Sequence, residues 1–281
     1  MELKKCLMKR VLNVIVTLSI LFTACNKDNE DDCACSSNQE YPSSAHVFHC
    51  AVTDIDGNTY DAVQIGSQVW MAENLHVSKY ADGTPIPKGR LNVSEYCSSD
   101  EPYFYVTYNT EGFGYNYQPL YGYLYNWPAV MNGANNSNTN PSGVQGVCPN
   151  GWHVPSDAEW KQLEEYVKNN SQYHCDNCEE CIAKALASTE RWHHSSNNCA
   201  VGNDPGSNNA TGFSAFPTGY YHPLFYGNDG DYAVLWSTTK VFEFDWGPLV
   251  FGISHDSTSV YRGEYYQAHE SMGIPVRCVR D

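Results

Sequence analysis

The fold is predicted from one stretch, Gly146-Val-Cys-Pro-Asn-Gly-Trp-His-Val-Pro-Ser-Asp-Ala-Glu-Trp-Lys-Gln-Leu-Glu-Glu-Tyr-Val167. Ser156 is followed three residues later by Glu159, which is the spacing of a capping box at the start of a helix. Apolar residues then recur on one helical face, with charged residues between them: Trp160, Leu163 and Val167. This pattern predicts one amphipathic helix from Ser156 to about residue 169.

A second motif, Pro275-Val-Arg-Cys-Val-Arg-Asp281, stands at the far end of the chain. Together with the Cys-Pro-Asn-Gly-Trp-His-Val-Pro lead-in to the helix, it resembles the Fibrobacter succinogenes major paralogous domain, a family of secreted and lipid-anchored bacterial domains. Further blocks similar to that family follow in its order: Val52–Tyr60, Ile65–Leu75, Tyr121–Trp127, Gly212–Pro217 and Leu235–Thr239. The resemblance covers residues 47–281, which we expect to form one domain.

The helix motif and the Arg-Cys-Val-Arg end are also similar to sulfatase-modifying-factor and C-type lectin-like domains. The resemblance therefore implies an α+β, C-type lectin-like domain with short strands, two or so helices and long ordered loops; the second helix is expected near residues 182–187. In that fold the chain end returns beside the segment before the helix, which implies a disulfide between Cys148 and Cys278. Closing so long a loop is worth about 4 to 5 kcal/mol in the chain-entropy model.

The N-terminus predicts export. Four basic residues precede an apolar run, Val11–Phe22, which is shorter than the roughly 20 residues of a membrane-spanning helix. The run ends in Leu21-Phe-Thr-Ala-Cys25, which resembles a lipobox, although Phe22 replaces the usual Leu. We therefore expect a lipoprotein signal peptide over residues 1–24 and a lipid on Cys25. The alternative is an ordinary signal peptide cleaved near Ala24, which would leave Cys25 able to form a disulfide.

Residues 25–46 are predicted to be an acidic and polar linker. The tract Asn-Lys-Asp-Asn-Glu-Asp-Asp after Cys25 resembles the surface-export signals of lipoproteins in some Gram-negative groups. It implies an outer-membrane protein that faces the cell exterior. The simpler interpretation is a solvated tether, and the tract can serve as both.

The charge of the chain excludes one class of partner. Four of the 16 basic residues and one of the 32 acidic residues precede Cys25, which leaves 12 basic and 31 acidic residues and a net charge of −19. So acidic a chain repels nucleic-acid phosphates and lacks a basic stripe, so no nucleic-acid partner is expected. Anionic membrane surfaces are disfavoured as well, and the lipid is the expected membrane attachment.

Ten cysteines remain after Cys6 and Cys25, and an even number in an exported protein predicts disulfides. Eight of them cannot be paired from sequence: Cys33, Cys35, Cys50, Cys97, Cys175, Cys178, Cys181 and Cys199. The run from Cys175 to Cys181, with His174 beside it, has the short spacing of zinc ligands. Because export favours oxidation, we prefer disulfides there and predict no metal.

Asp54-Ile-Asp-Gly-Asn58 resembles the start of a calcium loop, since clustered oxygens suit hard cations. The loop is incomplete, because Ile65 occupies the twelfth position, where such loops have glutamate. Apolar residues flank Asp56-Gly57 on both sides, which is the pattern of a hairpin turn. We therefore expect a turn.

Aromatic, acidic and histidine side chains crowd residues 220–270, between glycines and prolines. Stiff aromatic surfaces combined with directional hydrogen-bonding groups are typical of recognition surfaces such as antibody paratopes. The predicted ligand-binding residues are Tyr221, His222, Tyr226, Asp229, Asp231, Tyr232, Phe244, Asp245, Trp246, His255, Asp256, Tyr261, Tyr265, Tyr266 and His269. The alternative is that the aromatics are core residues of short strands. That role fits another set of residues better: Phe213, Phe216, Leu235, Trp236, Leu249, Phe251, Val260 and Val276.

The expected function is binding of a glycan or protein ligand at the cell surface, in adhesion or recognition. The position of the aromatic stretch is similar to the variable region of retroelement-diversified lectin-fold proteins. The first alternative is a structural subunit of a surface fibre or envelope complex. The second is an oxidase like the formylglycine-generating relatives, for which only Cys278 could be aligned. Nucleophile elbow, zinc-protease and phosphate-loop motifs are absent from the sequence, so no enzyme and no cofactor are predicted.

Overall fold

The computed structural model describes residues 41–89, 100–106, 121–222, 225–227, 229–240, 247–262 and 268–281. All of them belong to the compact unit Cys35–Asp281, which separates from Met1–Ala34 by its contacts. The predicted signal peptide and the predicted lipid site Cys25 lie outside the described residues. Within the described residues no helix is both long and apolar enough to span a membrane.

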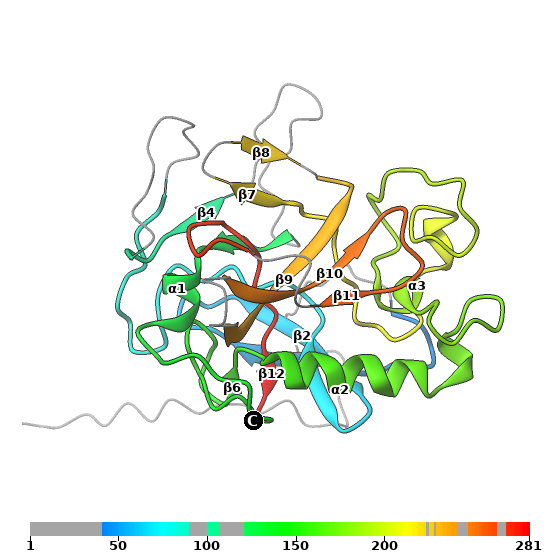
Figure 1. Cartoon of the computed structure of the whole chain (residues 1–281). Helices are drawn as coiled ribbons and strands as arrows, with labels where there is room; N and C mark the ends of the chain where they lie inside the picture. The colour runs from blue at the N-terminus through cyan, green and yellow to red at the C-terminus, as the bar shows by residue number, and fades with distance from the viewer. Residues whose placement is uncertain are drawn as a thin grey trace, which may run out of the picture. The chain divides into compact units, whose positions relative to one another are not determined.

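A five-stranded antiparallel sheet joins the two ends of this unit. Its order is β1-β2-β3-β12-β6, with β1 His46–Thr53, β2 Thr59–Ile65, β3 Gln68–Met71, β12 Val279–Arg280 and β6 Trp152–His153. Val279 pairs with Trp70 on one side and with His153 on the other. The last strand of the chain therefore lies between the N-terminal strands and the segment that leads into the long helix (Figure 1).

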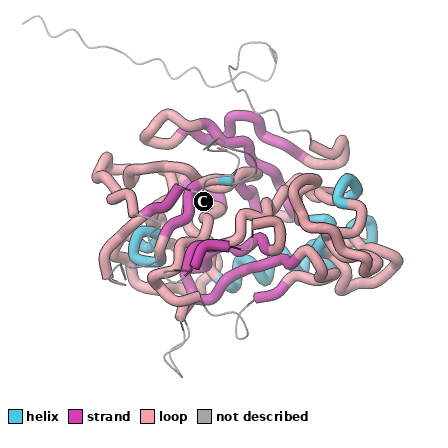
Figure 2. Tube along the Cα trace, turned by 90° about the horizontal axis from the view of Figure 1, so that it is seen from above, coloured by secondary structure: helices cyan, strands magenta, loops and turns pink. Residues whose placement is uncertain are grey.

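Three smaller antiparallel sheets and three helices complete the described fold, which is α+β. The strands are β4 Phe104–Val106 with β5 Tyr123–Tyr125, β7 Tyr220–His222 with β8 Phe225–Gly227, and β11 Tyr261–Arg262, β10 Pro248–Ser254 and β9 Tyr232–Lys240. The helices are α1 Trp127–Met131, α2 Asp157–Lys168 and α3 Ala183–Leu186, with 3₁₀ turns at Ser171–Tyr173 and Pro205–Ser207. Loops and turns make up a large share of the trace, as expected (Figure 2).

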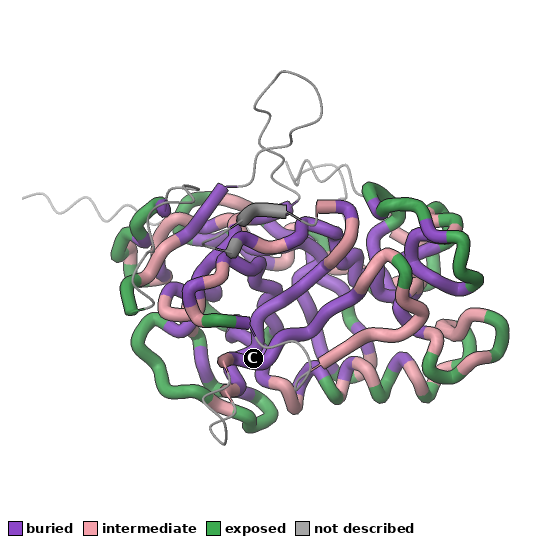
Figure 3. The backbone as a smooth tube through the Cα atoms, turned by 45° about the horizontal axis from the view of Figure 1, so that its top comes forward, coloured by how far each residue is buried: buried purple, intermediate pink, exposed green. Residues whose placement is uncertain are grey.

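The long helix α2 begins where the capping box predicts. The Ser156 side chain accepts a hydrogen bond from the Glu159 backbone, and the Glu159 carboxylate accepts one from the Ser156 backbone. Trp160 is fully buried and stacks between Trp70, at 4.4 Å, and Phe251, at 4.5 Å between ring centroids. Figure 3 shows buried and exposed residues alternating along α2 as its turns face inward and outward.

The predicted core set is buried with one exception. Phe213, Phe216, Leu235, Trp236, Leu249, Phe251 and Val276 are all buried. Val260 is partly buried and packs against the same apolar cluster as α2. Trp236 and Val276 belong to one apolar cluster, and Phe213, Leu235 and Phe251 belong to the cluster that contains Trp160 of α2.

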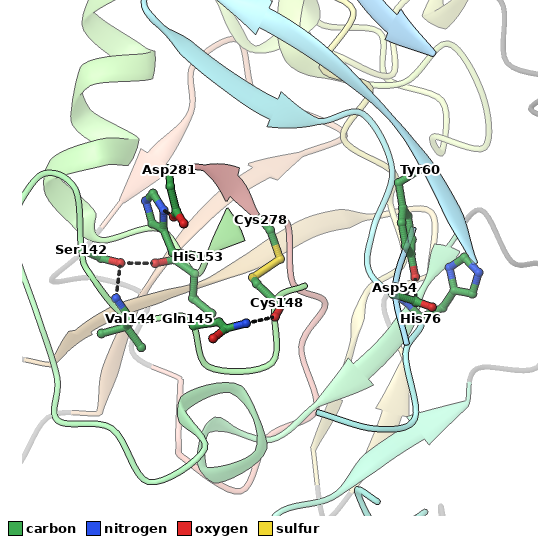
Figure 4. Close-up of a disulfide and its surroundings, with 11 residues drawn as sticks. Asp54, Tyr60, His76, Ser142, Val144, Gln145, Cys148, His153, Cys278 and Asp281 are labelled. Atoms are coloured by element: carbon green, nitrogen blue, oxygen red, sulfur yellow. Dashed lines mark hydrogen bonds and ion pairs between the residues drawn. A yellow bond between two sulfur atoms is a disulfide. The ribbon is translucent and has the colours of Figure 1, made fainter. Parts of the chain in front are cut away.

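Cys148 and Cys278 form a disulfide across 130 residues of sequence, and both are fully buried (Figure 4). This is the pair that the family resemblance implied. Two further disulfides join Cys175 to Cys199 and Cys178 to Cys181, and Cys50 is also disulfide-bonded. The sulfurs of the Cys175–Cys181 run are therefore committed to disulfides, and they offer no thiolates to zinc.

Asp54 organises the turn between β1 and β2. Its carboxylate accepts hydrogen bonds from the backbone of Asp56 at 2.9 Å and of Asn58 at 3.0 Å, and from the Tyr60 hydroxyl at 2.6 Å. Figure 4 shows the Asp54, Tyr60 and His76 side chains gathered at this point. The carboxylate is occupied in holding a turn, in line with the expected hairpin.

Candidate functional site

The fifteen predicted ligand-binding residues divide into three groups. Five lie outside the described residues: Phe244, Asp245, Trp246, Tyr265 and Tyr266. For His222 and Tyr226 the structure describes the strand but not the side chain. The remaining eight are Tyr221, Asp229, Asp231, Tyr232, His255, Asp256, Tyr261 and His269.

The prediction for Tyr221 as a surface residue is wrong. Its side chain is only 3 % exposed, and its ring lies 4.5 Å from that of Tyr105. The backbone of Tyr221 exchanges two hydrogen bonds with Gly273, which holds β7 against the C-terminal segment and turns this ring inward. A Cβ at position 273 would lie 3.1 Å from that of Tyr221, so glycine permits the close approach.

Three of the predicted residues, Asp231, His255 and Asp256, lie together. They meet His193 and Ser195 from a loop that is distant in sequence. His193 Nδ1 lies 2.7 Å from Asp231 Oδ1, and the Ser195 hydroxyl donates to Asp256. The sequence carried no signal for these two partners, because a lone His and Ser in a polar loop have no periodicity or spacing to mark them.

Four predicted residues remain. Asp229 is partly buried in the turn before β9. Tyr232 and Tyr261 are partly buried in the sheet of β9, β10 and β11. The ring of Tyr261 lies directly over Gly252, where a Cβ would come within 2.0 Å of it. His269 is exposed and hydrogen-bonds Ser271 through Nδ1 at 2.8 Å.

A pocket of about 510 Å³ lies beside α1. Glu270, the residue that follows His269, is part of its lining. Aromatic, proline, amide and carboxylate groups line it, among them Tyr80, Asp100, Pro102, Trp127, Asn132 and Glu270. Its walls come from the turn at 80–85, the segment 100–102, the helix α1 with the residues after it, and the segment at 270. None of the eight predicted residues whose side chains the structure describes lines this pocket.

The side chain of Asn126 fastens two of these walls together. As the N-cap of α1, its Oδ1 accepts from the backbone of Ala129 at 3.3 Å and of Tyr103 at 2.8 Å. Its Nδ2 donates to the Glu101 carbonyl at 2.7 Å. Asn126 is fully buried, and its polar atoms are paired by these hydrogen bonds. The segment before β4 is therefore fixed against the start of α1 by contacts within the protein.

Trp127 forms the aromatic wall, and three contacts fix its position. Its backbone N–H donates to the Glu270 carbonyl at 2.9 Å, and its indole Nε1 donates to the Ser237 carbonyl at 3.2 Å. Lys240 lies 6.0 Å from the ring centroid and forms an ion pair with the Glu270 carboxylate. The indole is partly buried, and the ion pair beside it is about one quarter exposed.

The charges near this pocket are balanced in part by pairing. The Lys240–Glu270 pair offers ammonium donors and carboxylate acceptors with no net charge of its own. Burial and the nearby Asp82 raise the pKa of Tyr80 to about 12, so this phenol stays protonated at neutral pH. Tyr80, Asn132 and Trp127 therefore offer neutral polar and aromatic groups to the pocket, and Asp100 adds a carboxylate.

The chain matches the family model of the Fibrobacter succinogenes major domain over residues 63–280. The chain belongs to this family. Neither a curated protein nor a solved structure matches it. The match identifies the family but assigns no activity to it.

The matched range of this Fibrobacter succinogenes major domain contains the pocket lining, the Cys148–Cys278 disulfide and the Asp231 group. The motif residues behind the resemblance are largely structural. His153 lies between Glu159, at 2.7 Å, and Asp281, at 2.6 Å, and Arg277 is completely buried. These motif residues are therefore occupied by contacts within the fold, and the pocket beside Trp127 is a candidate ligand site.

Proposed function

We propose that this protein is a lipid-anchored binding protein of the outer-membrane surface, and that the pocket beside Trp127 binds a carbohydrate. The observation that carries the proposal is a pocket of about 510 Å³ lined by Trp127 and Glu270, with Lys240 paired to Glu270 and lying near the indole ring. Ligand sites of this size combine apolar and aromatic walls with a few placed polar groups. A C-type lectin-like architecture is part of the proposal and is consistent with such a role.

A sugar fits this chemistry better than a strongly charged ligand does. The apolar face of a pyranose packs on an aromatic ring, while its hydroxyl groups both donate and accept hydrogen bonds. Glu270 supplies an acceptor and Lys240 supplies donors, and hydrogen bonds to charged groups are stronger than those between neutral groups. Because the two charges neutralise each other, a neutral ligand meets no unpaired charge from this pair.

The oxidase alternative finds no support in the geometry. Cys278, the one cysteine that could be aligned with that chemistry, is fully buried and bonded to Cys148. Its sulfur is therefore not available as a thiolate. A protein ligand and a structural subunit remain as outcomes of the test.

The test is a glycan array and a protein array probed with the purified chain, followed by calorimetry on any glycan that binds. Glu270→Gln keeps the shape of the side chain but removes its charge, and we expect at least tenfold weaker binding. Tyr166→Ala, a partly exposed aromatic on α2, is the control and should leave binding unchanged. Binding of proteins alone, binding of nothing, or equal glycan affinities for wild type and Glu270→Gln would contradict the carbohydrate proposal.

The anchor is tested separately. Cys25→Ala should release the protein from membranes and abolish incorporation of labelled fatty acid. A wild-type protein that is already soluble and unlabelled would contradict the lipid-anchor part of the proposal.

A further inference from the structure

The Lys240–Glu270 ion pair joins the end of β9 to the segment that closes the pocket. Lys240 is the last residue of β9 and is paired in register with Pro248 of β10. The backbone N–H of Ala268 donates to the Pro248 carbonyl at 3.4 Å. A Cβ at Gly247 would come within 2.0 Å of the Ala268 carbonyl oxygen, so glycine permits the two backbones to lie this close. Backbone contacts therefore place the segment of Glu270 beside the strand end that carries Lys240.

Trp127 is hydrogen-bonded to both of these segments. Its backbone N–H donates to the Glu270 carbonyl, and its indole donates to the Ser237 carbonyl of β9. Trp127 and Glu270 line the pocket, whereas Lys240 is not part of the lining. The Lys240 ammonium contacts the Glu270 carboxylate and lies 6.0 Å from the centroid of the indole ring. Lys240 therefore influences the pocket through the two lining residues that it contacts.

The partial burial of this pair makes its charge balance matter to a ligand. The side chains of Lys240 and Glu270 are each 24 % exposed, and charges that are partly buried are screened less by salt and water than charges on the open surface. Each charge offsets the other as long as both are present. Asp100, the other carboxylate of the lining, is exposed, where solvent screens its charge more strongly.

We propose that the Lys240–Glu270 pair makes the pocket selective for uncharged sugars, with Lys240 as the positioning residue that sets this selectivity; this rests on the proposed carbohydrate function. The hydroxyl groups of an uncharged sugar donate to the Glu270 carboxylate without disturbing its pairing with Lys240. The carboxylate of a uronic acid meets the like charge of Glu270, and the ammonium of an amino sugar meets that of Lys240. Like charges placed together across an interface weaken binding.

The experiment compares sugars that are matched except for their charge. The probes are linear tetrasaccharides of glucose, of glucosamine and of glucuronic acid, with the corresponding galactose and mannose sets, titrated into the full chain by calorimetry. At about pH 6 the amino groups are protonated and the uronic acids are ionised. We expect the wild type to bind the uncharged member of a set at least roughly tenfold more tightly than either charged member.

Two single variants should shift this preference in opposite directions. Lys240→Met leaves the Glu270 charge without its partner, so affinity for the amino sugar relative to the uncharged sugar should rise roughly tenfold. Glu270→Gln leaves the Lys240 charge without its partner, so relative affinity for the uronic acid should rise instead. The double variant should return both ratios to their wild-type values. Lys161→Met and Glu165→Gln break an exposed ion pair of α2 and are the matched controls, with both ratios unchanged.

Opposite shifts separate this role from a purely structural one, because partial unfolding would weaken binding of all members of a set together. Each variant is first checked for a cooperative unfolding transition. Wild-type protein that binds a charged member as tightly as the uncharged one, or ratios that stay constant in Lys240→Met, would overturn the selectivity while leaving the carbohydrate proposal intact. No binding to any of the three sets would also overturn it, whereas the arrays decide the carbohydrate proposal itself.

Discussion

Arg277, in the C-terminal motif, is a fully buried cation that acts as a structural centre. Its guanidinium donates to Asn74 Oδ1 through two nitrogens, at 3.1 and 2.8 Å, and to the carbonyls of Met71, Phe213 and Ser214. Burial lowers its pKa to about 9, an effect that the charge of Glu73 opposes, so it remains charged at neutral pH. The planar fork of donors satisfies several buried oxygens at once.

We expect Arg277→Lys to destabilise the protein by about 3 kcal/mol or more. A lysine ammonium cannot reach all of these oxygens from one point, and each buried oxygen left unpaired costs about 1 to 3 kcal/mol. Arg280→Lys is the control, since Arg280 is exposed and the one contact described for its side chain is to the ring of Phe48, at 5.4 Å from the centroid. Denaturant unfolding measures both, and equal stability of the two variants would contradict this role of Arg277.

At the scale of the element, the start of α2 is joined to the chain end through His153. The imidazole Nε2 contacts Glu159 of the capping box, and Nδ1 contacts Asp281. Burial alone would lower the pKa of His153, but the hydrogen bonds and charges of Glu159 and Asp281 raise it above its ordinary value of 6.5. A charged His153 therefore stabilises the helix start, β6 and the C-terminus together.

This raised pKa predicts how stability depends on pH. A group whose pKa is higher in the folded state contributes stability that is fully present below its unfolded pKa and is lost as the pH rises through the folded value. His153→Gln should therefore cost most, about 1 to 3 kcal/mol, near pH 5.5 and less at pH 9. Denaturant unfolding at both pH values measures this, with exposed His194→Gln as control; a cost that is constant or grows with pH would contradict it.

A second set of charges holds α2 along its length, from its first turn to its last. Arg262 of β11 contacts Glu164 and Asp157 of the helix, and Lys168 in the last turn contacts Glu164 and Glu180. Burial alone would raise the pKa of Glu164, but hydrogen bonds from Lys168 and Arg262 bring it below its ordinary value. A helix predicted from its own periodicity thus depends on partners that its periodicity cannot reveal.

For the molecule as a whole, the three disulfides whose two cysteines both lie in the described residues differ in the length of chain that they close. The sequence separations are 130 residues for Cys148–Cys278, 24 for Cys175–Cys199 and 3 for Cys178–Cys181. The first holds β12 beside the segment that leads to α2, so it secures the closure of the main sheet. The other two cross-link only residues between Cys175 and Cys199, a segment that follows α2 and contains α3.

Removing each disulfide by a pair of Cys→Ala substitutions should cost in the order of these separations. The chain-entropy model gives about 5 kcal/mol for the longest loop, about 3 for the middle one and about 1.5 for the shortest. Peptide mapping without reduction checks the pairing, and denaturant unfolding of the three double variants checks the order. A Cys178–Cys181 variant as unstable as the Cys148–Cys278 variant would show that loop length does not govern their contributions.

Several features could be predicted from the sequence because their causes are local or belong to the family motifs. The capping box and the spacing of Trp160, Leu163 and Val167 require only neighbours along one helix, and α2 starts and ends where they place it. The turn at Asp54 depends on residues within six positions. The pairing of Cys148 with Cys278 is not local, and it came from the resemblance of the two motifs.

Only the tertiary structure decided which polar and aromatic side chains meet. Tyr221 has the composition of a surface residue, but its strand pairs with Gly273 and its ring is buried against Tyr105. The Trp127 pocket takes its walls from four segments, and the His193–Asp231–His255 group takes its members from three. Helical and strand periodicity indicate which residues share a face of one element. These sites combine residues from segments far apart in the sequence, and only the tertiary structure brings such segments together.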